Sequence, residues 1–410
     1  MRMKLNKSSQ LLLVSAVSLL AAGLITACGT LTTDFVFVSS SRAAGADNYG
    51  EIDVYEINSV SGLMRQIPTS PFPSGGRNPV AEAVSADNGN LYVVNRDDNT
   101  IVQFMIGPDG KLYPQNTVNT PGIYPIAVTV NGSNLFVLDT YKPLPICSNA
   151  EPCAGSVAVF PILPSTGTGS SQKPAGALGP PVSNPAIGAN YWPLAVPGRP
   201  DDVVAPTAIN VLNPGTYAYV TAYDSTSNTG YIFGFSVSSG SLTPVNAGAP
   251  LASMSHPSAV ASDSSGKYLY VTDRVSGNLF AYAIGAGGSL TNLSGSPFQT
   301  GNQPSAVVAD SKYPYLYVAN AVDGSVSAYT IGSGGIPTSI GTYPTGVQPV
   351  AIGIDPSTHH FVFTVNFLSD NISDFQMNST TGALVHAQHS PYKSNAQPTA
   401  VAAIPHKGSQ

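Results

Sequence analysis

The triplet Pro-x-Ala, followed each time by a short apolar run, occurs seven times in this chain of 410 residues. Successive copies are separated by 46, 81, 51, 47, 45 and 49 residues. A repeat of 40 to 50 residues is typical of propellers and solenoids, in which each repeat is one supersecondary unit that cannot bury its apolar face alone. The triplets begin at Pro79, Pro125, Pro206, Pro257, Pro304, Pro349 and Pro398.

Each repeat has the composition of a group of short strands. After most Pro-x-Ala runs comes a turn and then a second apolar run, such as Leu316-Tyr317-Val318-Ala319-Asn320, and a third, such as Ser325-Val326-Ser327-Ala328-Tyr329. Runs of β-branched and aromatic residues bounded by Gly, Asn, Asp and Pro predict strands. A weaker fourth run completes each unit, and four strands form one propeller blade.

The two ends of the repeat array complement each other. The N-terminal part starts with a second strand at residues 34–39, and the C-terminal part ends with a first strand alone at residues 398–404. We therefore predict an all-β, seven-bladed propeller over residues 34–404, closed by pairing the N- and C-terminal strands in one blade, followed by a tail at 405–410. An open β-solenoid is the alternative, but it would not need complementary half-blades.

The repeat resembles a known family. The Leu-Tyr-Val-Ala-Asn strands, with Pro-x-Ala before and Gly-Ser-Val-Ser-Ala-Tyr after, are similar to the seven-bladed lactonase-type propellers and their YVTN-repeat relatives. The resemblance implies the propeller fold and, as one activity, hydrolysis of a sugar lactone as in 6-phosphogluconolactonases. It also implies His and Arg at the start of particular inner strands, where this chain has Tyr124 and Ala205 instead.

The first residues predict export. Basic residues precede an apolar run from Leu11 to Ile25, and the ending Ile25-Thr26-Ala27-Cys28 resembles a bacterial lipobox. We expect residues 1–27 to be a lipoprotein signal peptide, Cys28 to be lipidated and residues 28–33 to tether the propeller to a membrane. The protein would be periplasmic or on the cell surface, with Gly29 favouring the outer membrane. An ordinary signal peptide and a spanning anchor are the alternatives.

Charge and cysteine content fit an extracytoplasmic protein. Without residues 1–27 the chain has 13 basic and 22 acidic residues, a net charge of −9, so we expect no nucleic-acid partner. Cys147 and Cys153 are close enough in sequence for a disulfide, with free thiols or a metal site as alternatives; without nearby His a metal is not expected. No cofactor motif is recognised.

The long interval contains an insertion, residues 141–205, with the sole Trp of the chain, Trp192. Insertions in repeat arrays often decorate the binding face, so Trp192 is a candidate ligand-binding residue; a flexible surface loop is the alternative. In a blade, the turn entering the first strand and the loop leaving the second lie at the same end. This end brings together candidates for ligand binding, Gln303, Gln348 and Gln397, and for catalysis, Arg96, His256 and Arg274.

Glu82 breaks the pattern of the inner strands. It occupies the position three residues after the motif proline, which is Val or Ile in the other six copies. A buried carboxylate there must be paired with a cation such as Arg77 or Arg96, or it is an acid of raised pKa that a site uses. Two functions follow from these residues: binding of a small molecule, glycan or protein on the loop face, or lactone hydrolysis with Glu82 or His256 as base and Arg274 or Arg96 as electrophilic partner.

Overall fold

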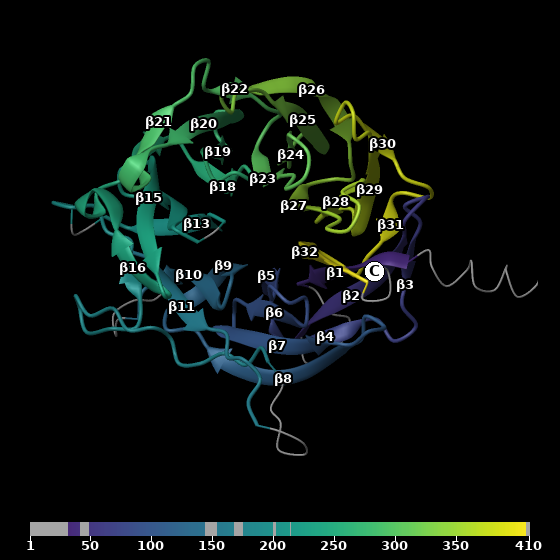
Figure 1. The fold of residues 1–410 in the computed structure, drawn as a ribbon, viewed down its shortest axis with the longest axis horizontal. Helices are drawn as coiled ribbons and strands as arrows, with labels where there is room; N and C mark the ends of the chain where they lie inside the picture. Colours follow the sequence, from purple (N-terminus) through teal and green to yellow (C-terminus); the bar gives the residue numbers. More distant parts are fainter. Residues whose placement is uncertain are drawn as a thin grey trace, which may run out of the picture.

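The computed structural model describes residues 32–41, 49–143, 154–167, 175–199, 202–213 and 215–406. Seven antiparallel sheets are arranged around a central channel (Figure 1), so the predicted seven-bladed propeller is confirmed. The innermost strands contact one another in a closed ring: β5, β9, β13, β18, β23, β27 and β32.

The blades follow one another along the chain, and we number them 1 to 7. Blade 1 comprises β5 (Pro79–Val84), β6 (Asn90–Asn95), β7 (Thr100–Ile106) and β8 (Leu112–Asn119). Blade 2 comprises β9 (Ile123–Asn131), β10 (Asn134–Tyr141), β11 (Ser156–Pro161) and β12 (Trp192–Pro193). Blade 3 comprises β13 (Val204–Val211), β14 (Tyr217–Asp224), β15 (Thr229–Ser238), β16 (Ser241–Pro244) and β17 (Ala252–Met254). Blades 4 and 5 comprise β18 (Pro257–Ser262), β19 (Tyr268–Asp273), β20 (Asn278–Ile284), β21 (Leu290–Asn292), β22 (Phe298–Gln299); and β23 (Pro304–Ala309), β24 (Tyr315–Asn320), β25 (Ser325–Ile331), β26 (Pro337–Pro344). Blade 6 comprises β27 (Pro349–Ile354), β28 (Phe361–Asn366), β29 (Asn371–Met377), β30 (Leu384–His386) and β31 (Tyr392–Lys393). Two 3₁₀ turns, Val245–Gly248 and Ala286–Gly288, are the helical elements in the described residues.

Blade 7 is built from both ends of the chain, as predicted. Its inner strand is β32 (Pro398–Pro405), which pairs antiparallel with β1 (Thr32–Ser40), followed by β2 (Tyr49–Asn58), β3 (Met64–Gln66) and β4 (Phe72–Arg77). In this pairing Asp34 lies opposite Pro405 and Ser40 opposite Pro398. The chain therefore enters the propeller at the end of the disc away from the motif prolines.

The Pro-x-Ala triplet is a β-bulge at one mouth of the channel. In all seven inner strands the pairing with the second strand shifts register at this triplet, which leaves the middle residue without a ladder partner. In blades 4 and 5 the middle residue is a serine that bonds the next blade: the hydroxyl groups of Ser258 and Ser305 donate to the carbonyl oxygens of Pro304 and Pro349, at 2.6 and 2.7 Å. Thr399 does the same to Pro79 at 2.8 Å. The motif thus joins the inner ends of neighbouring blades.

The hydrophobic core lies between the blades. Seven buried clusters each combine residues of two neighbouring sheets, as where Val362 and Phe375 of blade 6 pack with Tyr317 of blade 5. Burial of these aliphatic and aromatic side chains at about 25 cal/mol per Å² is the main stabilisation of such a ring. Buried tyrosines of second strands also donate to a glycine carbonyl of the next blade, as Tyr317 does to Gly382 at 3.0 Å.

The insertion serves blade packing, and one prediction about it is wrong. Trp192 is 2% exposed, pairs with Val157 through β12 and β11, and packs in the cluster between blades 2 and 3. It is an outer-strand core residue, so it cannot contribute to a ligand-binding face. Elsewhere in the insertion, the carbonyl of Gly176 accepts a hydrogen bond from Tyr92 at 2.7 Å, the role that Gly382 has for Tyr317.

Two predictions fall on residues outside the described part of the chain. The signal peptide with Cys28, and the Cys147–Cys153 pair, belong to these residues. The structurally described part holds no helix with the length and hydropathy of a membrane-spanning segment.

Candidate functional site

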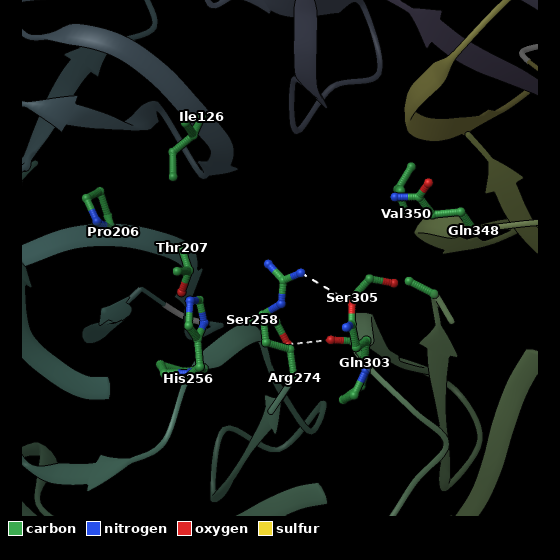
Figure 2. Close-up of a pocket in the computed structure, with 13 residues that line it drawn as sticks. Ile126, Pro206, Thr207, His256, Ser258, Arg274, Gln303, Ser305, Gln348 and Val350 are labelled. Carbon is green, nitrogen blue, oxygen red and sulfur yellow. Dashed lines mark hydrogen bonds between the residues drawn. The ribbon is translucent and has the colours of Figure 1, made fainter. Parts of the chain in front are cut away.

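A cavity of about 350 Å³ opens at the channel mouth where the bulges lie (Figure 2). The middle residues of the Pro-x-Ala triplets of five consecutive blades line it: Ile126, Thr207, Ser258, Ser305 and Val350. Four of the predicted site residues line it as well: His256, Arg274, Gln303 and Gln348. The cavity therefore lies at the end of the disc where the chain enters the first strands and leaves the second strands, the end at which the repeat pattern grouped these candidates.

His256 and Arg274 are placed opposite each other by the first two strands of blade 4. His256 immediately precedes β18, and Arg274 immediately follows β19. The backbone amide of His256 donates to Oδ2 of Asp273 at 2.7 Å, and the amide of Arg274 donates to the carbonyl of His256 at 2.9 Å. Because strands β18 and β19 are antiparallel neighbours, these bonds fix both residues at the cavity rim.

The environment of His256 keeps its imidazole neutral. The ring stacks on Tyr223 with centroids 4.0 Å apart, and Nδ1 is buried without a hydrogen-bond partner among the described residues. Burial, and next the nearby Arg274 guanidinium, lower the pKa of His256 below its ordinary value of 6.5. A neutral imidazole whose Nδ1 is enclosed has Nε2 left to accept a proton from water.

Arg274 supplies the positive charge of the cavity. Figure 2 shows its guanidinium extending into the space between His256 and Gln303. Its Nη2 donates to Oε1 of Gln303 at 3.4 Å, a long bond that leaves most of its donors available to a ligand. Gln348, from the next blade, lies across the cavity. A neutral base beside a permanent cation can activate water and stabilise an oxyanion.

Other predicted candidates lie away from this cavity. Arg96 packs over the ring of Tyr124, with its guanidinium carbon 5.3 Å from the ring centroid, and is not among the lining residues. Gln397 is not among them either; its backbone amide donates to Asp370 at 2.8 Å. Arg96 and Gln397 therefore lie at the predicted end of the disc, together with His256, but they do not line its cavity.

Glu82 is enclosed between blades 1 and 7 and does not reach His256. It accepts a hydrogen bond from the hydroxyl of Ser39, while its Oε1 is buried without a partner among the described residues. Glu82 as a whole is partly exposed, but its Oε1 atom is buried and does not belong to the exposed part. Burial raises the pKa of Glu82 to about 7.

The predicted ion pair of Glu82 is wrong. Arg77 pairs with Asp98 instead, and Arg96 lies over Tyr124. Among the described residues no Lys or Arg forms a salt bridge with Glu82. The alternative prediction, a carboxyl of raised pKa, is the one that the structure supports, but at a position outside the cavity.

Sequence reasoning missed the bulge residues as lining residues. Thr207, Ser258 and Ser305 were visible as the middle residues of the motif, and their position beside the bulge is the signal that could have identified them. The described residues contain no group of three or more His, Cys, Asp or Glu side chains arranged to hold a metal ion.

Comparison with known proteins agrees with this architecture. Residues 291–402 match the family model described as "Lactonase, 7-bladed beta-propeller". The match covers 112 of the 410 residues, and the chain as a whole is a seven-bladed β-propeller. No curated protein matches the sequence.

Solved structures share the fold over nearly the whole propeller. A candidate 6-phosphogluconolactonase from Bacteroides fragilis has a TM-score of 0.67 and 19% identity, covering 91% of this chain and 98% of that one. The periplasmic gluconolactonase PpgL of Pseudomonas aeruginosa has a TM-score of 0.64 and 18% identity, covering 91% and 99%. A propeller of Chaetomium thermophilum, Sqt1, solved with the N-terminus of ribosomal protein L10, has a TM-score of 0.54 and 12% identity, covering 89% of each chain. At these identities the chain shares a fold with all three, and its function must be argued from its own cavity.

Proposed function

We propose that this lactonase-type propeller hydrolyses a sugar-derived lactone in the cavity at the channel mouth. The observation that carries the proposal is the placement of neutral His256 beside Arg274 in a cavity large enough for one sugar ring. One fold neighbour is named a periplasmic gluconolactonase and another a candidate 6-phosphogluconolactonase, which favours hydrolysis of a sugar lactone over other uses of the fold.

The reaction needs a base and a site for developing negative charge. Nε2 of His256 takes a proton from water while the water oxygen attacks the lactone carbonyl carbon, and the carbonyl oxygen becomes an oxyanion beside Arg274. The bond from the carbonyl carbon to the ring oxygen then breaks, and His256 returns its proton to that oxygen. The product is a hydroxy acid, whose carboxyl group then loses a proton to solvent and faces Arg274 as a carboxylate.

The charge of the cavity favours an unphosphorylated substrate. Among the described residues that line it, Arg274 is the permanently charged side chain and His256 is held neutral. A phosphate group carries between one and two negative charges at neutral pH and is usually held by several cationic or amide donors.

An assay of the purified protein tests the proposal. Glucono-δ-lactone should be hydrolysed above its spontaneous rate, and its 6-phosphate more slowly. Binding without turnover is the second candidate: saturable binding of gluconate at the cavity with no rate above the spontaneous one would replace hydrolysis by recognition.

We further propose that the protein is exported and anchored through lipidated Cys28. Strand β1 starts at Thr32, opposite the end of the disc that carries the motif prolines. A membrane anchor just before this residue would direct the cavity away from the membrane. Labelling of the chain with a radioactive fatty acid, lost in a Cys28→Ala variant, is the test; absence of label in the wild type would exclude the anchor.

A further inference from the structure

We infer that the site extends beyond one ring and takes a disaccharide aldonolactone, with the lactone ring in the channel-mouth cavity and the glycosyl ring in a second cavity between blades 4 and 5. This inference rests on the proposed lactone hydrolysis. Its starting point is that a cavity of about 420 Å³ adjoins the first and shares two lining residues with it, Arg274 and Gln303.

The shared residues make the two cavities one continuous site. Both residues are exposed, and the bond from Nη2 of Arg274 to Oε1 of Gln303, at 3.4 Å, is at the long limit for a hydrogen bond. A ligand that offers hydroxyl groups at this point replaces that bond at little cost, because both side chains keep a partner. Arg274 and Gln303 therefore lie between the two cavities without preventing a bound ligand from occupying both.

The second cavity has lining residues of two kinds. Val275 and Val322 are exposed aliphatic side chains, with 71% and 61% of their surface accessible. Ser276, Asn302 and Gln303 offer a hydroxyl and two side-chain amides. A pyranose ring matches this combination, since its C–H faces are apolar while its edge carries hydroxyl groups that donate and accept.

The aliphatic residues are specific to one side of the channel mouth. The position two residues after the last residue of the second strand is Val275 in blade 4, Val322 in blade 5 and Leu368 in blade 6. In blades 1 and 3 the corresponding residues are Asp97 and Thr226. Of these three aliphatic residues, Val275 and Val322 line the second cavity, so their exposed side chains are placed to contact a ligand there.

The charge of the second cavity limits the ligand further. Asp323, at its edge, is already bonded to Asn302 through the backbone amide at 2.7 Å and the side-chain amide at 2.8 Å. Apart from the shared Arg274, the described lining residues of the second cavity are uncharged. The group bound there is accordingly neutral, as a glycosyl ring is and as a phosphate or uronate is not.

The test compares cellobiono-δ-lactone with glucono-δ-lactone on the full protein and two double variants. Val275→Ala/Val322→Ala removes the aliphatic contacts of the second cavity, and Val347→Ala/Leu368→Ala is the matched control on the same rim, because neither Val347 nor Leu368 lines either cavity. We expect a kcat/KM at least about tenfold higher for the disaccharide lactone, reduced about fivefold in the first variant, unchanged in the control, and no change for the monosaccharide lactone.

The outcomes separate the inference from the proposed function. Hydrolysis of both lactones at equal efficiency, or equal effects of the two double variants, would overturn the second cavity and leave lactone hydrolysis standing. If neither lactone is hydrolysed, the proposed function fails, and calorimetry with cellobionate and gluconate decides the cavity: tighter binding of cellobionate that depends on Val275 and Val322 supports it, and equal binding overturns it.

Discussion

The backbone amide of Arg274 donates a 2.9 Å hydrogen bond to the carbonyl oxygen of His256, so the candidate base and the candidate oxyanion donor are held by one pair of strand ends. The equivalent bond recurs between Arg96 and Asn78 in blade 1, at 3.0 Å, and between Ala321 and Gln303 in blade 5, at 2.9 Å. The repeat thus supplies the geometry, and blade 4 alone among these three places a histidine before its first strand.

Replacing His256 should abolish most of the hydrolysis. In His256→Gln the amide keeps the size and polarity of the side chain but cannot accept a proton from water, so we expect kcat/KM for glucono-δ-lactone to fall about 10²- to 10⁴-fold. The matched control is His386→Gln, since His386 packs against Phe375 at the outer edge of blade 6. A variant as active as the wild type would remove His256 from the mechanism.

Replacing Arg274 should slow the chemical step more than binding. Loss of one oxyanion donor typically costs about 10²- to 10³-fold in kcat, and Arg274→Gln should show a loss of this size in steady-state kinetics. Arg65→Gln, which removes an exposed arginine paired with Glu56 on blade 7, should leave kcat unchanged. Equal effects of the two substitutions would point to a general charge effect instead of an oxyanion contact.

The pH dependence of hydrolysis should report the lowered pKa of His256. The base is active when neutral, so kcat/KM should fall only at a pH below 6.5, the ordinary value. In Arg274→Gln one cause of the lowering is removed, and the acidic limb should move to higher pH. An acidic limb above 6.5 in the wild-type protein would contradict the assignment of His256 as base.

The repeat predicted the fold well because each part of the repeat unit corresponds to one strand of a blade. Pro-x-Ala marked every inner strand, and the half-blades at residues 34–39 and 398–404 predicted the composite blade that β1 and β32 form. The prediction that His256, Arg274, Gln303 and Gln348 lie at the same end of the disc followed from the same geometry, and all four line one cavity there. Arg96 and Gln397 lie at the same end but do not line this cavity, because position along the axis of the disc does not say which part of the ring a cavity occupies.

Trp192 and Glu82 show the other limit of the sequence. The sequence of an insertion does not indicate which of its residues form the fourth strand of the blade. Trp192 belongs to that strand through a pairing of only two residues, which is too short to give a recognisable sequence pattern. For Glu82, the choice between an ion pair and a protonated acid depends on where Arg77 and Arg96 point, and both are used elsewhere.

Trp192 should matter for stability and not for activity. Truncation of a buried Trp typically lowers the free energy of unfolding by about 3 to 5 kcal/mol, so Trp192→Ala should unfold at lower urea concentration. At a temperature where the variant is folded, its kcat/KM for glucono-δ-lactone should equal that of the wild type. A loss of kcat/KM in the folded variant would show that Trp192 contributes to the active site after all.

Glu82 should make the protein less stable as pH rises. Its pKa is about 7 in the folded chain and 4.5 as the ordinary value, which we take for the unfolded chain. Between these values the folded state holds a proton that the unfolded state has lost, so the free energy of unfolding falls with rising pH by about 3 kcal/mol in total. The contribution is present below pH 4.5 and lost above pH 7.

Glu82→Gln removes this dependence, because the amide keeps a hydrogen-bonding group toward Ser39 without a charge to bury. Urea unfolding should therefore show the variant close to wild type at pH 4.5 and more stable by about 3 kcal/mol at pH 8. Glu56→Gln, on an exposed pair with Arg65, is the control and should change stability by less than about 1 kcal/mol at either pH. A Glu82→Gln variant that is less stable than wild type at pH 8 would mean that the carboxylate is ionised and stabilised there, and that the seam between blades 1 and 7 holds a cation partner that the described residues do not provide.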